Sequence, residues 1–400
     1  MYHQVVIIGA GPVGGRLATE LASRGISTLL VEEHAEIGRP FQCAGLVNPP
    51  AMSMVDLQET ILQNVDGALI HSPSGIVVPV GRDGHTRTHV VCRKRFDQGV
   101  VAQAMKAGAH LWLLSKPIEA ITNSDGVQLK IEREGEIIEV NCDLLIGADG
   151  AHSWTRRHFK LGRPKEMMIG FQADVSGLVG KPNWLEMYTG RDVAPGLFAW
   201  VIPSGNNTHR IGVWARPQDL EGRSVEQCYD ALINHPLWKE RFAGVKEIAR
   251  YCGPVPCGII QKPFKNRVMV IGDAAGMAKP TTGGGIGPGF RQVEAIIDNL
   301  EKAIMIGRLN ASDLATVCKP FKALRKEQDR ARALRDLLVS TPDDDELDSH
   351  FEMFNRPEVL KIINLEGDIE HPVPLGITLL RKVPGFRKLA LKAGFKLIFA

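Results

Sequence analysis

The first residues with a chemical pattern are the closely spaced glycines Gly9, Gly11 and Gly14, which follow an apolar run from Gln4 to Ile8. After a strand, this spacing permits a tight turn, lets the backbone approach a phosphate and lets the next helix pack closely. The start of that helix then points its free N–H groups at the phosphate. Glu32 ends the next apolar run, where a carboxylate can accept the hydroxyls of a ribose. The pattern predicts a dinucleotide site, without separating NAD from FAD.

Two later segments again place an acidic residue and glycine at the end of an apolar run. Asp149 and Gly150 follow the run from Leu144 to Gly147, and Asp273 follows another buried strand. An acidic residue at the end of a strand can bind a hydroxyl of a ligand. The glycines from Gly283 to Gly285 can bring helix-start N–H groups against phosphates or against a ring that gains negative charge.

These three segments, in this order, resemble the motifs of FAD-dependent aromatic hydroxylases and their relatives. The resemblance implies FAD as the cofactor. It also implies that Arg93 contacts the flavin, where the alternative is a surface arginine at a helix start, and that the backbone of Ala120 meets the adenine end. The residues implied to contact FAD are Gly9, Gly11, Val13, Gly14, Glu32, Cys43, Ala44, Leu46, Arg93, Ala120, Asp149, Gly150, Asp273, Gly285 and Ile286.

Two segments narrow the resemblance to one branch. The stretch from Gly38 to Leu46 and the run from Gly272 to Ile286 are similar to segments of the geranylgeranyl reductase family, particularly its archaeal digeranylgeranylglycerophospholipid reductases. Two departures stand out. The Cys-x-Gly-x-Gly of that family appears as Cys43-Ala-Gly-Leu-Val, and its Tyr-x-Trp-x-Phe-Pro appears as Phe198-Ala-Trp-Val-Ile-Pro. The second departure removes a tyrosine hydroxyl and one aromatic ring, so the substrate can differ in detail.

The resemblance implies reduction of isolated carbon–carbon double bonds in geranylgeranyl chains of membrane lipids. Because such a bond has no carbonyl to polarise it, hydride from N5 of the reduced flavin needs a proton donor on the opposite side. Cys43 is the candidate, although its thiol could instead shape the pocket or fill space as a small buried side chain. Phe198, Trp200 and Ile202 share one face of a predicted strand, where they could line a tunnel for an isoprenoid chain or form an ordinary sheet core.

Two other functions remain open. An aromatic-type monooxygenase using NADPH and oxygen would carry the same flavin motifs, and a non-catalytic flavin electron carrier would not need an apolar tunnel. The cysteine segment and the triple glycine favour the reductase. The electron donor is open as well: ferredoxin, a reduced nicotinamide and a quinol-type donor are all compatible with a sequence that shows no second nucleotide motif.

The elements that must position these residues follow from the apolar periodicity. A strand from Gln4 to Ile8, a helix ending near Gly25 and a strand from Ser27 to Val31 form a predicted βαβ unit. Three short strands between Pro117 and Asn141 form a predicted meander, followed by a separate strand over Leu144 to Gly147. Residues from Phe198 to Trp214 predict a hairpin.

We therefore expect an α/β fold, α+β overall, with a Rossmann-type FAD-binding domain, a β-sheet substrate domain and a helical C-terminal part. The predicted FAD-binding domain is discontinuous and comprises residues 1–60, 85–165 and 260–310. The predicted substrate domain comprises 61–84 and 166–259, and 311–400 form the helical region.

Composition limits the partners. A formal net charge of +3 on 400 residues gives no support to nucleic-acid binding. No signal peptide or spanning segment is recognised, which predicts a cytoplasmic protein. The seven scattered cysteines predict no metal site, with Cys252 to Cys257 in a turn, and Asp343 to Asp348 read as a solvated loop. Residues 375–400 carry basic and apolar side chains without an acidic one, so they could bind a membrane surface peripherally or dock as a helix on the protein.

Overall fold

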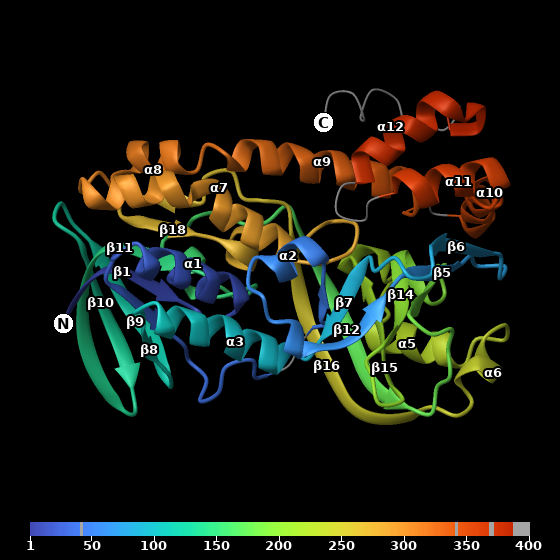
Figure 1. Cartoon of the computed structure of the whole chain (residues 1–400), viewed down its shortest axis with the longest axis horizontal. Coiled ribbons are helices and arrows are strands. Elements are labelled where there is room, and N and C mark those ends of the chain that lie inside the picture. Colours follow the sequence, from blue (N-terminus) through green and yellow to red (C-terminus); the bar gives the residue numbers. More distant parts are fainter. Residues whose placement is uncertain (41–42, 341–342, 368–371, 387–400) are drawn as a thin grey trace.

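The computed structural model describes residues 1–40, 43–340, 343–367 and 372–386. Figure 1 shows two large β-sheets side by side, with a row of helices along one edge of both. That row consists of α7 (Ile286–Met305), α8 (Ala311–Val317) and α9 (Phe321–Leu338). The α/β class with a helical C-terminal region is confirmed.

The first sheet contains the N-terminal strand and has eight strands. Its main path runs in the order β17, β18, β11, β1, β2, β8, and β9 and β10 continue antiparallel from β11. β1 pairs in parallel with both β2 and β11, as the predicted βαβ unit requires. The strands are β1 (Tyr2–Ile8), β2 (Thr28–Val31), β8 (His110–Trp112), β9 (Ser115–Thr122), β10 (Val127–Arg133), β11 (Glu136–Gly147), β17 (Phe264–Lys265) and β18 (Val268–Val270).

Both faces of this sheet are covered, which explains why β1 is apolar along its whole length. On one face, Val5 and Ile7 pack against α1 (Pro12–Ser23) and α7. On the other face, Val6 and Ile8 pack against the β9–β10 meander. α3 (Arg93–Lys106) lies beside α1, and α4 (Trp154–His158) follows β11.

The second sheet has seven strands in the order β16, β12, β15, β14, β13, β5, β6. Its strands are β5 (Gly67–His71), β6 (Val77–Gly81), β12 (Glu166–Ser176), β13 (Trp184–Gly190), β14 (Ala194–Pro203), β15 (Thr208–Ala215) and β16 (Lys246–Cys257). The predicted hairpin is confirmed as β14 and β15. Helices α5 (Val225–Ile233) and α6 (Lys239–Phe242) cover one face, and part of the other face packs against a third, small sheet.

A small third sheet connects the two large ones. It consists of β3 (Leu46–Val47), β7 (Thr88–Val91) and β4 (Ile61–Val65), with α2 (Pro49–Ser53) beside it. Val65 and Val90 pack against Leu185 and Ile202 of the second sheet. The segment 61–84 is therefore divided, because β4 belongs here while β5 and β6 join the seven-stranded sheet. The short 3-10 helices are η1 (Gln58–Thr60), η2 (Pro217–Asp219) and η3 (Gly272–Ala275).

The C-terminal helices α10 (Asp344–Phe354), α11 (Pro357–Glu366) and α12 (Pro372–Lys382) lie over the β5–β6 edge and the end of α9 (Figure 1). No helix in the described part of the chain combines the length and the hydropathy that a bilayer span requires. The segment 387–400, which holds most of the basic tail, lies outside the described residues.

Three local predictions were wrong. The meander strand and the strand over Leu144 to Gly147 are one continuous strand, β11. Cys252 to Cys257 form the end of β16, an edge strand, where proline costs no ladder hydrogen bond inside the sheet. Asp343 starts a helix instead of a loop, because its side chain accepts the N–H of Asp345 and the acidic first turn favours the helix N-terminus.

Candidate functional site

The turn after β1 is shaped by three glycines with different surroundings. Gly9 has a φ of +100°, and a Cβ there would lie 2.5 Å from the carbonyl oxygen of Ala148. A Cβ on Gly14 would collide with the Gly9 carbonyl, so helix α1 packs closely on the turn. By contrast, a Cβ on Gly11 would meet no atom within 4 Å. Gly11 thus faces open space at the start of α1, where a pyrophosphate can approach the N–H groups.

Glu32 lies at the end of β2, beside this turn. Its Oε2 accepts the N–H of Ala10 at 2.9 Å, and its Oε1 accepts the N–H of His34 at 3.1 Å. The carboxylate is therefore fixed in place by backbone donors from both sides. Oε1 also lies 2.6 Å from Nδ1 of His34, so Oε2 is the oxygen that keeps a lone pair for a ribose hydroxyl.

Asp149 follows β11 and is engaged by the protein. Its Oδ2 accepts the N–H and the hydroxyl of Thr155 at 2.9 and 3.0 Å, and its Oδ1 accepts the Ser153 hydroxyl at 2.5 Å. Burial raises the pKa of Asp149, and these hydrogen bonds oppose the shift. The structure thus places Asp149 as the anchor of α4. Gly150 beside it has a φ of +69° and open space around its Cα.

Asp273 follows β18 and has very different surroundings. Within the described residues, no donor hydrogen-bonds to its carboxylate. Burial raises the pKa of Asp273 to about 6, with the guanidinium of Arg93 opposing the shift. A Cβ on Gly285 would lie 2.7 Å from its Oδ1, so the glycine loop closes directly over the carboxyl group.

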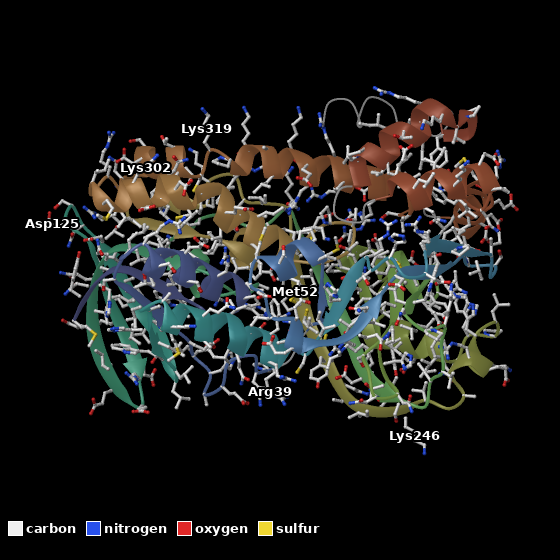
Figure 2. All side chains as sticks on the ribbon, viewed as in Figure 1. Arg39, Met52, Asp125, Lys246, Lys302 and Lys319 are labelled. Atoms are coloured by element: carbon white, nitrogen blue, oxygen red, sulfur yellow. The ribbon has the colours of Figure 1, made fainter. Side chains whose placement is uncertain are left out.

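Val13 and Ile286 join the first motif to the third. A Cβ on Gly272 would lie 3.2 Å from Val13, and one on Gly289 would lie 2.3 Å from the same side chain. Ile286 begins α7 and packs with Phe96 and Phe290. In Figure 2, the neighbouring Met52 of this cluster lies near the middle of the molecule. The N-terminal turn and the glycine loop therefore meet, as a dinucleotide that spans both would require.

Arg93 lies inside the molecule at the start of α3. Its Nε and Nη2 donate to the two carboxylate oxygens of Asp97 at 3.0 and 2.9 Å. The guanidinium also contacts the Cys43 side chain and acts on Asp273. Arg93 thus brings the cysteine segment and the third motif together. Its side chain is only 15% exposed, so the alternative of a surface arginine does not describe it.

The remaining predicted contacts divide into two groups. Ala44 and Leu46 lie next to Cys43, and Leu46 pairs with Val90 in the small sheet. Residues 41 and 42 of the same segment lie outside the described residues. Ala120 is elsewhere, in β9, where its carbonyl oxygen lies 2.8 Å from Nε2 of His158. The backbone of Ala120 thus already has a partner in α4.

The three predicted substrate residues share one face of β14. Phe198 and Trp200 pack with edge-to-face geometry, their ring centroids 6.4 Å apart, and the Trp200 indole lies over Gly212. Ile202 packs against the small sheet. Phe198 also lines a largely apolar cavity of about 140 Å³ between β14, the glycine loop and α9. Its lining residues are Leu197, Phe198, Thr281, Leu334, Arg335, Leu338 and Val339.

Sequence reasoning missed several residues around this cavity. Trp214 of β15 packs against Phe198, with centroids 5.6 Å apart, and would contact a Cβ on Gly283 at 3.1 Å. Extending the hairpin register would have placed Trp214 and Arg210 on the same face as Ile202, because the cross-strand partner of Ile202 is Arg210. No local signal pointed to the α9 residues, since only tertiary packing brings that helix to the glycine loop.

These residues fit FAD. Gly11 leaves space for phosphates at the start of α1, and the Asp273 carboxylate has no protein donor in the described part of the chain. The buried hydroxyl of Thr282, in the adjoining loop, also lacks a partner among the described residues. A ligand with phosphates at one end and hydroxyls near Asp273 would satisfy these groups.

Comparisons with known proteins agree with this geometry. The model of the FAD binding domain family matches residues 2–305. The digeranylgeranylglycerophospholipid reductase of Methanosarcina acetivorans is 31% identical over 293 residues, covering 71% of each chain. The enzyme of that name from Methanocaldococcus jannaschii is 32% identical, covering 71% of this chain and 73% of its own.

A solved structure supports the fold over the whole chain. The crystal structure of a geranylgeranyl bacteriochlorophyll reductase-like protein from Thermoplasma acidophilum has a TM-score of 0.85 and 24% identity, covering 98% of this chain and 99% of that protein. The family model and the curated relatives thus agree on the cofactor and on the class of enzyme, and the solved structure agrees on the fold. The chain belongs to the FAD-binding family of flavin-dependent oxidoreductases whose curated members include digeranylgeranylglycerophospholipid reductases.

Proposed function

We propose that the protein is an FAD-dependent reductase that saturates isolated double bonds in geranylgeranyl chains of membrane lipids. The observation that carries the proposal is the apolar cavity beside the glycine loop, lined by Phe198 of β14 and by Leu334 and Leu338 of α9. An aliphatic chain gains free energy when it leaves water for such a cavity, roughly 0.8 kcal/mol for each buried methylene. The names of the curated relatives point to the same substrate class.

The reaction needs a hydride for one carbon of the double bond and a proton for the other. Bound FAD, once reduced, supplies the hydride. The Cys43 thiol supplies the proton, and the thiolate that remains is reprotonated from water. The Sγ of Cys43 accepts the N–H of Gly45 at 3.3 Å, and Arg93 lies against the same side chain. These contacts hold the thiol in place and provide a cation beside the thiolate.

Arg93 and Asp273 take separate roles in this proposal. The Asp273 carboxylate has no protein donor among the described residues. It would accept a hydrogen bond from a ribityl hydroxyl of FAD. Arg93, held by Asp97, orients Cys43 towards the flavin. The electrons come from an external donor, either ferredoxin or a reduced nicotinamide.

The test starts from the anaerobic protein with its FAD reduced by dithionite. We expect a geranylgeranyl lipid to reoxidise the flavin, with a mass gain of two hydrogens for each double bond reduced. Cys43→Ser should slow this reoxidation about a hundredfold, since general acid catalysis contributes on that order. Cys252→Ser, which changes an exposed cysteine, is the matched control and should leave the rate unchanged.

Three outcomes would contradict the proposal. No reoxidation by any prenyl compound would exclude the reductase. Hydroxylation of an aromatic compound with NADPH and oxygen would favour a monooxygenase, and electron exchange without a reduced product would favour a carrier.

We also propose that residues 375–400 attach the protein to an anionic membrane surface, where its substrate resides. In the described part of this segment, Phe386 is buried and its ring centroid lies 5.4 Å from that of Phe354. A deletion should therefore begin at residue 387, so that Phe386 keeps its packing. After this deletion, the fraction of the protein that sediments with vesicles containing phosphatidylglycerol should fall. Unchanged binding would refute the attachment. Lys382→Glu, at the end of α12, is a second variant that keeps the full length of the chain and reverses one charge.

A further inference from the structure

Arg210 reaches from the substrate sheet to the cysteine segment. It lies on β15 with 5% of its surface exposed, opposite Ile202 of β14 and Asp174 of β12. Its side chain is therefore on the same face as Phe198 and Trp200, yet it ends among backbone groups of another sheet. A buried guanidinium is costly unless donors find acceptors, so its contacts identify what it is there to hold.

Its hydrogen bonds go to carbonyl groups of the cysteine segment and of β7, and its Nε lies 4.0 Å from Oδ1 of Asp174. Nη1 donates to the carbonyl oxygen of Ala44 at 2.7 Å and to that of Val91 at 3.3 Å. Nη2 donates to the Val91 oxygen at 3.4 Å. The N–H of Val91 in turn donates to the carbonyl oxygen of Gly45 at 2.8 Å. One side chain thus joins the residue after Cys43 to the end of a strand.

Gly45 makes this contact possible. Its φ is +74°, and a Cβ there would lie 2.2 Å from Nη1 of Arg210. Its N–H donates to the Sγ of Cys43 at 3.3 Å. The orientation of the thiol is therefore set by a short segment. Arg210 donates a hydrogen bond to its backbone on one side, and β7 donates one on the other. The carbonyl group of Ala44, to which Arg210 donates, belongs to the residue directly after Cys43.

We propose that Arg210 is a positioning residue for the reduction step, which holds Cys43 and the segment up to Gly45 at the flavin. The inference rests on the proposed function. The hydrogen bonds of Arg210 go to protein carbonyl groups, so we assign it no contact with the reacting carbons. It acts through Cys43. Because it is part of β15, it also links the position of the proton donor to that of the substrate sheet.

The test compares Arg210→Met, which keeps the length of the side chain, with Arg241→Met. Arg241 is a matched control because it is also a partly buried arginine at the same sheet, but it pairs with Glu186 on the α5 side, with Nη2 2.6 Å from Oε1. We expect Arg210→Met to lower kcat for flavin reoxidation about tenfold to a hundredfold at unchanged KM, as a misplaced proton donor would. Arg241→Met should keep kcat.

Two further readouts separate positioning from stability. Arg210→Lys should restore part of kcat, because an ammonium group can reach one of the two carbonyls. In a Cys43→Ser background, Arg210→Met should have no further effect on kcat, because the group that it positions is gone. A full additive loss in the double variant would overturn the proposal.

Amide hydrogen exchange tests the same contact without substrate. In the Arg210→Met variant, we expect the amide hydrogens of Gly45 and Val91 to exchange about tenfold faster than in the wild type. The amide hydrogens of α5 should exchange at wild-type rates. Wild-type exchange at Gly45 overturns the inference even if prenyl compounds are reduced. Faster exchange with an unchanged kcat overturns it too. If the wild type reduces no prenyl compound, the proposed function fails, and the exchange experiment still decides whether Arg210 holds the segment.

Discussion

The turns after β11 and β18 look alike in sequence and differ in structure. Each places an aspartate at the end of a parallel strand of the first sheet, and the two strands are neighbours. Asp149 accepts hydrogen bonds from Ser153 and Thr155 of its own helix start. Asp273 has no such donor in the described part of the chain, although burial raises its pKa to about 6.

The difference shows that the same motif type can have its carboxylate engaged by the fold or left without a protein donor among the described residues. After β11 the chain enters α4, whose start offers two hydroxyls and an N–H to the carboxylate. After β18 the chain forms a short 3-10 helix and a glycine loop, which offer none. The Asp273 carboxylate is partly exposed in the protein alone, so a ligand that binds beside it can supply the donor that the protein does not.

The largest expected effect is on stability at the first turn. Asp149→Ala removes three hydrogen bonds and leaves buried donors without an acceptor, so the free energy of unfolding of the FAD-free protein should fall by about 3 kcal/mol. Urea denaturation measures it. Asp125→Ala, in the exposed turn between β9 and β10 (Figure 2), serves as control. A loss below about 1 kcal/mol would mean that Asp149 does not anchor α4.

At the second turn the effect should be on affinity. Asp273→Ala removes the acceptor of a ribityl hydroxyl, which should raise the Kd for FAD about thirtyfold, or roughly 2 kcal/mol. The FAD-free protein should be as stable as the wild type or more so, because the carboxyl group that is lost has no protein donor among the described residues and a raised pKa. Flavin fluorescence titration and urea denaturation measure the two quantities. An unchanged Kd for FAD would mean that Asp273 does not bind the cofactor and that the two turns do not differ in this role.

The pH dependence sharpens the same comparison. The pKa of Asp273 is about 6 in the folded protein against an ordinary value of 3.8, so the folded state holds the proton more tightly. This group therefore lowers the stability of the FAD-free protein as the pH rises from about 4 to about 6.

A ribityl hydroxyl prefers the ionised carboxylate as its acceptor, so FAD affinity should rise about tenfold between pH 5 and 7. Titrations at several pH values test this, with Asp273→Asn as the variant that should be independent of pH. A wild-type affinity that stays flat over this range would show that Asp273 does not meet the cofactor.

The smallest effects concern the glycines beside each aspartate. Gly150→Ala should cost about 1 kcal/mol of stability, because its φ of +69° strains a side chain while the space around it is open. Gly285→Ala should leave stability nearly unchanged and weaken FAD binding about threefold, since its Cβ pushes the movable end of Asp273. Thermal unfolding and FAD titration of both variants check this. The reverse pattern would exchange the roles assigned to the two turns.

Much of the flavin-binding half could be predicted because its signals are local. Gly9 and Gly14 are required by a backbone conformation and a close approach that a few neighbouring residues define. The face shared by Phe198, Trp200 and Ile202 follows from strand alternation alone. The Asp343 helix and the β16 edge strand were missed because a cap and the position of a strand within a sheet are not properties of a short apolar pattern.

The sequence by itself determined the cofactor, the order of the three motifs and the parallel sheet that carries them, since glycine spacing and strand periodicity act over a few residues. Tertiary structure alone decided that the glycine loop closes over Asp273, where a Cβ on Gly285 would lie 2.7 Å from its Oδ1. It also decided that Arg210 grips the segment after Cys43 and that α9 closes the apolar cavity. Hydrogen-bond satisfaction and cavity walls depend on groups that are distant in the chain, and only folding brings those groups together.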